Sequence, residues 1–273
     1  MGRELSTAPE IASAFAVNWN EGKKYVGRGL LAKFFVNVGH EEFANLAMDC
    51  EKAGVTDHAF FKLLCDLSWP ENFFWLGHVY GDMGELADDL LREETAGSAK
   101  FAGDELLWSL QYFWRDDPVR CEALGKMYDR GKESGSSRIP VLELAYFLGG
   151  RILLDGQIFS SGQEAESYVR GLREKSPTDH FRFLLRNHQE AEEYRILAGE
   201  DSELGAVLTP DLRAPDLDYA ALGLEGHSPA VLGKYGIHVV DGSVSRFADL
   251  FPGAGRSGRH ARVLLFLAPP PEN

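Results

Sequence analysis

The clearest pattern in the chain is a short apolar run, a glycine, a second short apolar run and a polar residue that opens a helix. It occurs at residues 72–91, NFFWLGHVYGDMGELADDLL, and again at residues 151–170, RILLDGQIFSSGQEAESYVR. Two short apolar runs on either side of a glycine predict an antiparallel β-hairpin, and Asp155-Gly156 is a dipeptide that a type I′ turn prefers. Each stretch therefore predicts a hairpin that leads into an α-helix.

The start of each predicted helix carries the same capping signal. Asp82 stands five residues after Gly77, and Glu85 follows three residues later. Ser161 and Glu164 hold the same places in the second stretch. This spacing is typical of a capping box, in which the cap and the Glu satisfy free N–H groups of the first helical turn. The agreement of turn, cap and helix at one offset predicts a duplicated module.

We expect an α+β fold that is mainly helical, with tandem duplicated modules that each hold a small antiparallel β-hairpin followed by a helix. An apolar helix precedes each hairpin, and Leu63 and Leu67 of the first correspond to Leu144 and Leu148 of the second. The repeat therefore extends back through two or three helices.

The predicted organisation begins with an N-terminal segment, residues 1–27, and a first module, residues 28–95. A second module covers residues 104–175. Residues 176–273 are a candidate degraded third module with a mobile C-terminal tail. The signals for it are an amphipathic helical pattern over 180–198 and a hairpin pattern at 237–243, IHVVDGS.

Composition and charge narrow the class of protein. The 273 residues are 44% hydrophobic and 26% charged, as in soluble globular proteins, and no run of about 18 apolar residues predicts a membrane-spanning helix. The net charge is −14, and residues 28–93 hold 5 basic and 12 acidic residues. An acidic protein does not offer the clustered basic face that nucleic acid needs. The acidic first module permits a basic partner, although a solvated acidic face explains the same charge more simply.

The three cysteines, Cys50, Cys65 and Cys121, form no CxxC pair and lie in apolar helical contexts. This usage is typical of small buried side chains in a reducing compartment. We therefore expect a cytoplasmic protein.

The sequence has no HExxH, GxSxG or P-loop motif. The sharpest constellation is His180, Leu184, His188 and Glu192, at four-residue intervals along one predicted helix. His188 and Glu192 could pair by a hydrogen bond or ligate a divalent metal with His180, although a zinc site would need further ligands. A solvated helix face explains the same pattern, so we expect no metal and no cofactor.

The predicted binding residues are the aromatic and polar side chains around the first hairpin, namely Trp69, Trp75, His78 and Tyr80. Two of them differ between the predicted copies, because Leu154 stands in the place of Trp75 and Gln157 in that of His78. Aromatic side chains of a hairpin can pack in the core, or they can anchor a peptide in a groove.

These patterns favour a cytoplasmic, non-enzymatic protein- or peptide-binding or regulatory protein built from tandem repeats. The alternative is a hydrolase-like enzyme with a His and carboxylate site in the cleft between the modules. A binding protein should have an open apolar groove, whereas an enzyme should have a closed pocket with convergent titratable groups.

Overall fold

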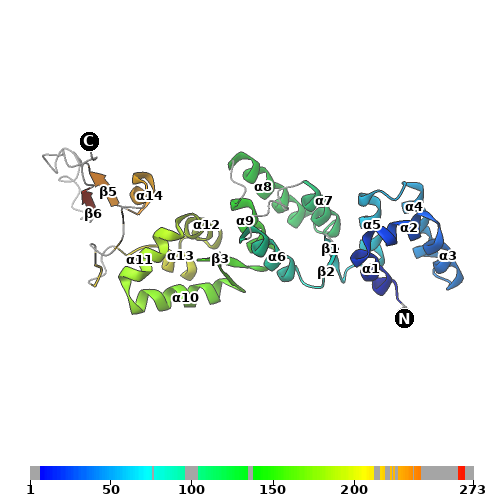
Figure 1. Cartoon of the computed structure of the whole chain (residues 1–273), viewed down its shortest axis with the longest axis horizontal. Helices are drawn as coiled ribbons and strands as arrows, with labels where there is room; N and C mark the ends of the chain where they lie inside the picture. The colour runs from blue at the N-terminus through cyan, green and yellow to red at the C-terminus, as the bar shows by residue number, and fades with distance from the viewer. Residues whose placement is uncertain are drawn as a thin grey trace. The chain divides into compact units, whose positions relative to one another are not determined.

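The computed structural model describes residues 7–75, 77–95, 104–134, 138–211, 216–218, 222, 224, 227–235, 237–240 and 264–267. The chain divides into two compact units, Met1–Arg151 and Ile152–Asn273 (Figure 1). Among the described residues, no helix combines the length and the hydropathy that crossing a membrane requires.

The first unit is helical apart from one hairpin. Its elements are α1 (Ala8–Val17), α2 (Trp19–Gly27), α3 (Leu30–Asn37), α4 (Glu41–Lys52), α5 (Asp57–Ser68), β1 (Phe73–Trp75), β2 (His78–Tyr80), α6 (Met83–Thr95), α7 (Asp104–Phe113), α8 (Pro118–Ser134) and α9 (Ile139–Gly149).

The core of the first unit forms around the hairpin. Strand β1 pairs with β2 in antiparallel register, and α1 contacts both strands and α5. Phe73 and Phe74 point to opposite faces of the hairpin, yet their exposed fractions are only 0% and 1%. Both faces of β1 are therefore covered, and the rest of the core comes from helices that pack on them, with Phe60, Leu64, Leu86 and Leu110 fully buried.

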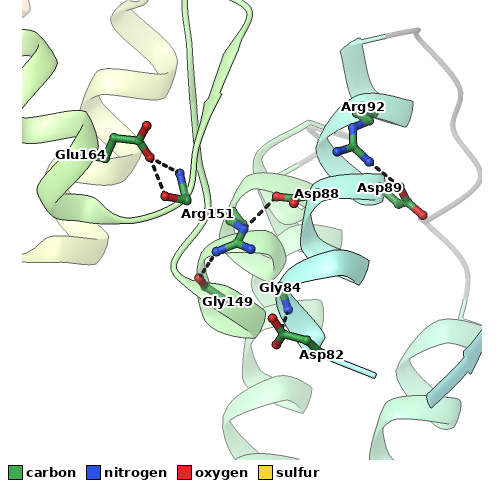
Figure 2. Close-up of polar contacts among 9 residues, drawn as sticks. Asp82, Gly84, Asp88, Asp89, Arg92, Gly149, Arg151 and Glu164 are labelled. Atoms are coloured by element: carbon green, nitrogen blue, oxygen red, sulfur yellow. Dashed lines mark hydrogen bonds and ion pairs between the residues drawn. The ribbon is translucent and has the colours of Figure 1, made fainter. Parts of the chain in front are cut away.

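Helix α6 packs along α9 at a point where neither helix has a side chain. A Cβ atom built on Gly149 would lie only 2.7 Å from Cα of Gly84. Next to this crossing, Nε of Arg151 donates to Oδ1 of Asp88 at 2.8 Å, and the same guanidinium reaches the carbonyl oxygen of Gly149 (Figure 2). Close backbone packing of Gly149 on Gly84 and the ion pair between Arg151 and Asp88 therefore hold the end of α9 against α6.

The second unit holds β3 (Ile152–Leu154), β4 (Gln157–Phe159), α10 (Gly162–Lys175), α11 (Pro177–Arg186), α12 (His188–Ala198), α13 (Glu203–Val207), α14 (Pro229–Lys234), β5 (Ile237–Val240) and β6 (Leu264–Leu267). Strands β3 and β4 form an antiparallel hairpin, and α10 packs against α11 and α13. Two backbone N–H groups of the β3 segment are satisfied by side chains. Leu153 N donates to Oη of Tyr194 at 2.9 Å, and Asp155 N donates to Oδ1 of Asn187 at 2.8 Å.

The two antiparallel hairpins predicted from the sequence are confirmed, and so is the mainly helical α+β class. Asp155 and Gly156 have φ values of 52° and 76°, as both central residues of a type I′ turn require. Oγ of Ser161 accepts the N–H of Glu164 at 3.2 Å, as predicted. The Glu164 carboxylate accepts the N–H of Ser160, the residue before the cap, and not that of Ser161 itself (Figure 2). The contact is therefore a close variant of the predicted capping box.

The single helix predicted over 180–198 is wrong, because the chain breaks at Asn187 into α11 and α12. The Asn187 side chain is 6% exposed, and its Nδ2 donates to the carbonyl oxygen of Phe183 at 2.9 Å. Its Oδ1 accepts the N–H of Asp155. A buried amide that bonds to backbone groups in this way competes with the helical hydrogen bonds and ends the helix.

Only the first strand of the hairpin predicted at 237–243 lies within the described residues. Strand β5 covers Ile237–Val240, but its partner is β6, and the two strands are parallel. The predicted turn, Asp241-Gly242, lies outside the described residues. The predicted first strand is therefore present, and its pairing with β6 was not predicted, because pairing with a distant segment leaves no local turn signal.

The same order of elements occurs twice, three helices followed by a hairpin and a helix. It runs through α3, α4, α5, β1, β2 and α6, and then through α7, α8, α9, β3, β4 and α10. The boundary between the compact units follows Arg151, which lies inside the predicted second module, 104–175. The predicted domain boundaries thus stay a prediction.

Candidate functional site

An open groove of about 730 Å³ lies in the first unit, where three helices begin beside the hairpin. It is lined by Trp19 and Asn20 of α2, Asp57, His58 and Phe61 of α5 with Thr56 before it, Phe74, Trp75 and Gly77 of the hairpin, and Glu105, Trp108 and Ser109 of α7. This volume is within the range of roughly 300–1,000 Å³ that is usual for ligand sites.

Three of the five tryptophans of the chain meet in this groove. The Trp19 ring packs edge-on against Phe60, with 4.8 Å between the ring centroids. The Trp108 ring lies 4.2 Å from the ring of His58 and 5.7 Å from that of Phe61. Both indoles are thus fixed by aromatic neighbours, and both remain partly exposed.

The third indole, that of Trp75, has an unsatisfied polar atom. Its Nε1 is buried and has no hydrogen-bond partner within the described parts of the chain. A buried donor without an acceptor costs about 1–3 kcal/mol, and such groups are rare in native proteins. Among the described residues that line the groove, Trp75 is therefore the one with a buried hydrogen-bond donor that lacks an acceptor.

Asp57 places a negative charge at one wall of the groove, and two hydrogen bonds stabilise that charge. Its Oδ1 accepts hydrogen bonds from Nε1 of Trp19 at 2.8 Å and from Nζ of Lys23 at 2.9 Å. These two bonds, the one from Trp19 first, lower the pKa of the Asp57 carboxyl below its ordinary value. Asp57 is therefore ionised at neutral pH.

The charges of the lining have one sign. Two carboxylates, Asp57 and Glu105, belong to it, and the set of lining residues includes no Lys or Arg. The Glu105 side chain is exposed and has no ion-pair partner among the residues that the structure describes. The groove therefore combines aromatic faces with acidic edges.

The structure brings one of the four predicted binding residues into this groove. Trp75 lines it, whereas His78 is exposed on β2 and is not part of the lining. Tyr80 is 5% exposed and donates from Oη to Oδ2 of Asp89 at 3.1 Å, so its ring belongs to the core. The face of Trp69 is covered by the guanidinium of Arg115, 4.5 Å from the ring centroid.

A smaller hollow of about 330 Å³ lies on another part of the first unit, and its lining includes Pro70, Tyr80, Trp114 and Arg120. The Arg120 guanidinium lies over the Trp114 ring, 4.8 Å from its centroid. The aromatic face at this hollow is thus already occupied by a side chain of the protein, and the larger groove is the stronger candidate.

The chain has no match among protein-family models, curated proteins or solved structures. The site therefore has to be judged from its own residues. Sequence reasoning missed Trp19, Trp108 and His58, because they come from helices far apart in the chain and share no spacing. A local signal exists only for Thr56, since threonine is a favoured N-cap residue and its Oγ1 accepts the N–H of Ala59 at 3.2 Å.

The helix break at Asn187 separates one candidate metal ligand, His180 of α11, from the other two, His188 and Glu192 of α12. His180 is buried, and its Nε2 donates to the carbonyl oxygen of Val207 at 2.7 Å. Glu192 forms an ion pair with Lys234, and Nδ1 of His188 lies 3.2 Å from the carbonyl oxygen of Leu185. Within the described residues, no group of three or more His, Cys, Asp or Glu side chains could hold a metal ion.

Proposed function

We propose that this protein is a non-enzymatic peptide-binding protein, and that the tryptophan-lined groove of its first unit is the binding site. The unsatisfied Nε1–H of Trp75 is the observation that carries the proposal. An extended peptide presents free carbonyl oxygens along its backbone, and a carbonyl that met this donor after a small rotation of the indole would satisfy it.

The rest of the lining supports this function. Tryptophan side chains supply most of the binding energy at many protein interfaces, and three of them line one open groove here. Phe74 and Phe61 form an apolar floor, with exposed fractions of 1% and 5%. Exposed polar side chains, Asn20, Asp57 and Glu105, form the rim. An apolar centre with a polar rim is the usual anatomy of a protein interface.

An array of synthetic 12-residue peptides tests this function directly. The full chain should retain a subset of the peptides, and Trp75→Ala should weaken the retained peptides by roughly 10- to 100-fold, as is usual for an anchor residue. His78→Ala is the matched control, because it removes an exposed aromatic side chain of the same hairpin outside the groove. The proposal is contradicted if the wild type and Trp75→Ala bind the retained peptides equally well while circular dichroism shows both proteins folded.

We also propose that residues 28–93 and 106–172 are copies of one module. The repeated order of helices and hairpins supports this, together with the shared glycine and cap positions. On this proposal the second copy lost the site, since Leu154, which is fully buried, stands where the first has Trp75. An experimental structure in which the two backbones do not superpose over these ranges contradicts it.

A further inference from the structure

The groove has acidic edges that are only partly used. Trp19 Nε1 and Lys23 Nζ both bond to Oδ1 of Asp57, and Oδ2 has no hydrogen-bond partner within the described residues. The Glu105 carboxylate is likewise unpaired there. Two anionic acceptors thus border one aromatic surface.

We infer that the ligand inserts a lysine or arginine side chain into this groove, where its positive charge lies against the indole faces and pairs with Glu105 and Oδ2 of Asp57. This inference rests on the proposed function, because it specifies the residue that a bound peptide must carry.

Cations bind well to such surfaces. An ammonium or guanidinium within about 6 Å of a ring centroid is attracted by the negative face of the ring, most strongly for tryptophan. Arginine side chains make this contact with the two tryptophans outside the groove, since Arg115 lies over Trp69 and Arg120 over Trp114. The three indoles of the groove have no such cation among the described residues, although they have the same chemistry.

Lys23 shows that one edge of the groove already accepts an ammonium group. Its Nζ lies 2.9 Å from Oδ1 of Asp57, the same oxygen atom that accepts the Trp19 N–H. The Asp57 side chain is nevertheless 76% exposed, so a second cation can approach its other oxygen from solvent.

The positive N-termini of the helices at the groove oppose the binding of a cation, but their effect is smaller than that of the carboxylates. Helices α2, α5 and α7 begin there, and each N-terminus carries about half a positive elementary charge. Asp57 and Glu105, in the first turns of α5 and α7, each place a full negative charge on such an end. The carboxylate charge at Glu105 therefore exceeds that of its own helix end, and this excess favours a cation.

The test uses four acetylated and amidated five-residue peptides, Ala-Ala-X-Ala-Ala, in which X is arginine, lysine, norleucine or glutamate. Binding to the full chain is followed by the NMR signals of the tryptophan indole N–H groups. We expect the arginine and lysine peptides to shift the signals of Trp19, Trp75 and Trp108. We expect the norleucine peptide, which has a similar apolar stem without charge, to bind at least tenfold more weakly.

Glu105→Gln should weaken the arginine peptide by about three- to tenfold and reduce the dependence of its affinity on salt. Glu85→Gln is the matched control, because Glu85 is an exposed first-turn carboxylate of α6 outside the groove. It should leave the affinity unchanged.

Three results overturn the inference. They are equal binding of the norleucine and arginine peptides, preference for the glutamate peptide, and the absence of any shift of the three groove indoles by the arginine and lysine peptides. The proposed function fails separately, when peptides from the array bind Trp75→Ala as well as they bind the wild type.

Discussion

Gly84 and Gly149 contact each other through their backbones where α6 crosses α9. A Cβ atom on Gly149 would lie 2.7 Å from Cα of Gly84 and 3.3 Å from its nitrogen. Because both atoms that it would meet belong to the backbone, no side-chain rotation can make room for it. The interhelical distance in this part of the core thus depends on the absence of one methyl group.

Gly149→Ala should therefore destabilise the protein by about 1–3 kcal/mol, the usual cost of overpacking a rigid contact. Urea unfolding followed by circular dichroism measures the change. Gly125→Ala is the control, since a Cβ there would meet only a flexible side-chain atom of Gln111 at 3.9 Å. In the interior of α8 it should be neutral or stabilise by about 0.5–1 kcal/mol. Equal stability of Gly149→Ala and wild type would mean that the helices are not this close.

Gly156→Val should destabilise the second unit by roughly 1–3 kcal/mol. Gly156 has a φ of 76°, and a Cβ there would meet nothing within 4 Å, so the cost is conformational and not steric. Gly156→Asn should keep most of the stability, because asparagine tolerates the left-handed region. Thermal melts compare the two variants, and equal midpoints for Val and Asn would refute the turn geometry.

Asn187→Ala should cost about 1–3 kcal/mol, because the N–H of Asp155 would lose its acceptor. The side chain also bonds to Phe183, so part of the loss arises at the end of α11. Chemical unfolding of the variant measures the change. Gln189→Ala, an exposed site two residues along, is the control and should change the free energy of unfolding by less than about 0.5 kcal/mol.

His180 should make the stability of the second unit depend on pH. Burial lowers the pKa of its imidazole, and the nearby Arg173 lowers it further, against the opposing effects of the Val207 carbonyl and Asp211. The native state therefore binds a proton less readily than the unfolded chain, and stability is lost as the pH falls below the ordinary pKa of histidine, about 6.5.

We expect the free energy of unfolding of the wild type to fall more between pH 7.5 and 5 than that of His180→Gln, whose amide can still donate to Val207. The slope that one histidine can add is at most about 1.4 kcal/mol per pH unit. Equal slopes for the two proteins in urea titrations at each pH would show that His180 does not titrate differently on folding.

Local signals in the sequence predicted the elements well. The Asp155-Gly156 dipeptide predicts its turn, and Ser161 predicts the start of its helix, because each acts within a few residues of its own position. The Asn187 break was missed, since it depends on a hydrogen bond to Asp155, 32 residues earlier in the chain. A periodic pattern cannot report such a partner.

Of the four binding residues predicted from the sequence, only Trp75 lines the candidate groove. The pattern singled out Trp75 because hairpin aromatics are conspicuous, but whether it faces a groove depends on Trp19 and Trp108, which arrive with α2 and α7. Tyr80 was singled out on the same grounds, and packing places it in the core, where its hydroxyl bonds to Asp89. Whether such a side chain is exposed depends on which helices pack against the hairpin, and the alternation of side chains along a strand does not determine this packing.

The hydrogen bonds from Leu153 and Asp155 to side chains of Tyr194 and Asn187 have a consequence for aggregation. An open strand edge is a template on which another chain can add a strand, and here the N–H of Leu153 in β3 and that of Asp155 just after it are already occupied. Tyr194 lies within α12, and Asn187 is the residue immediately before that helix. Detachment of this one helix would uncover the edge and the apolar residues of β3 together. The docking of α12 therefore protects the second unit against self-association through its hairpin.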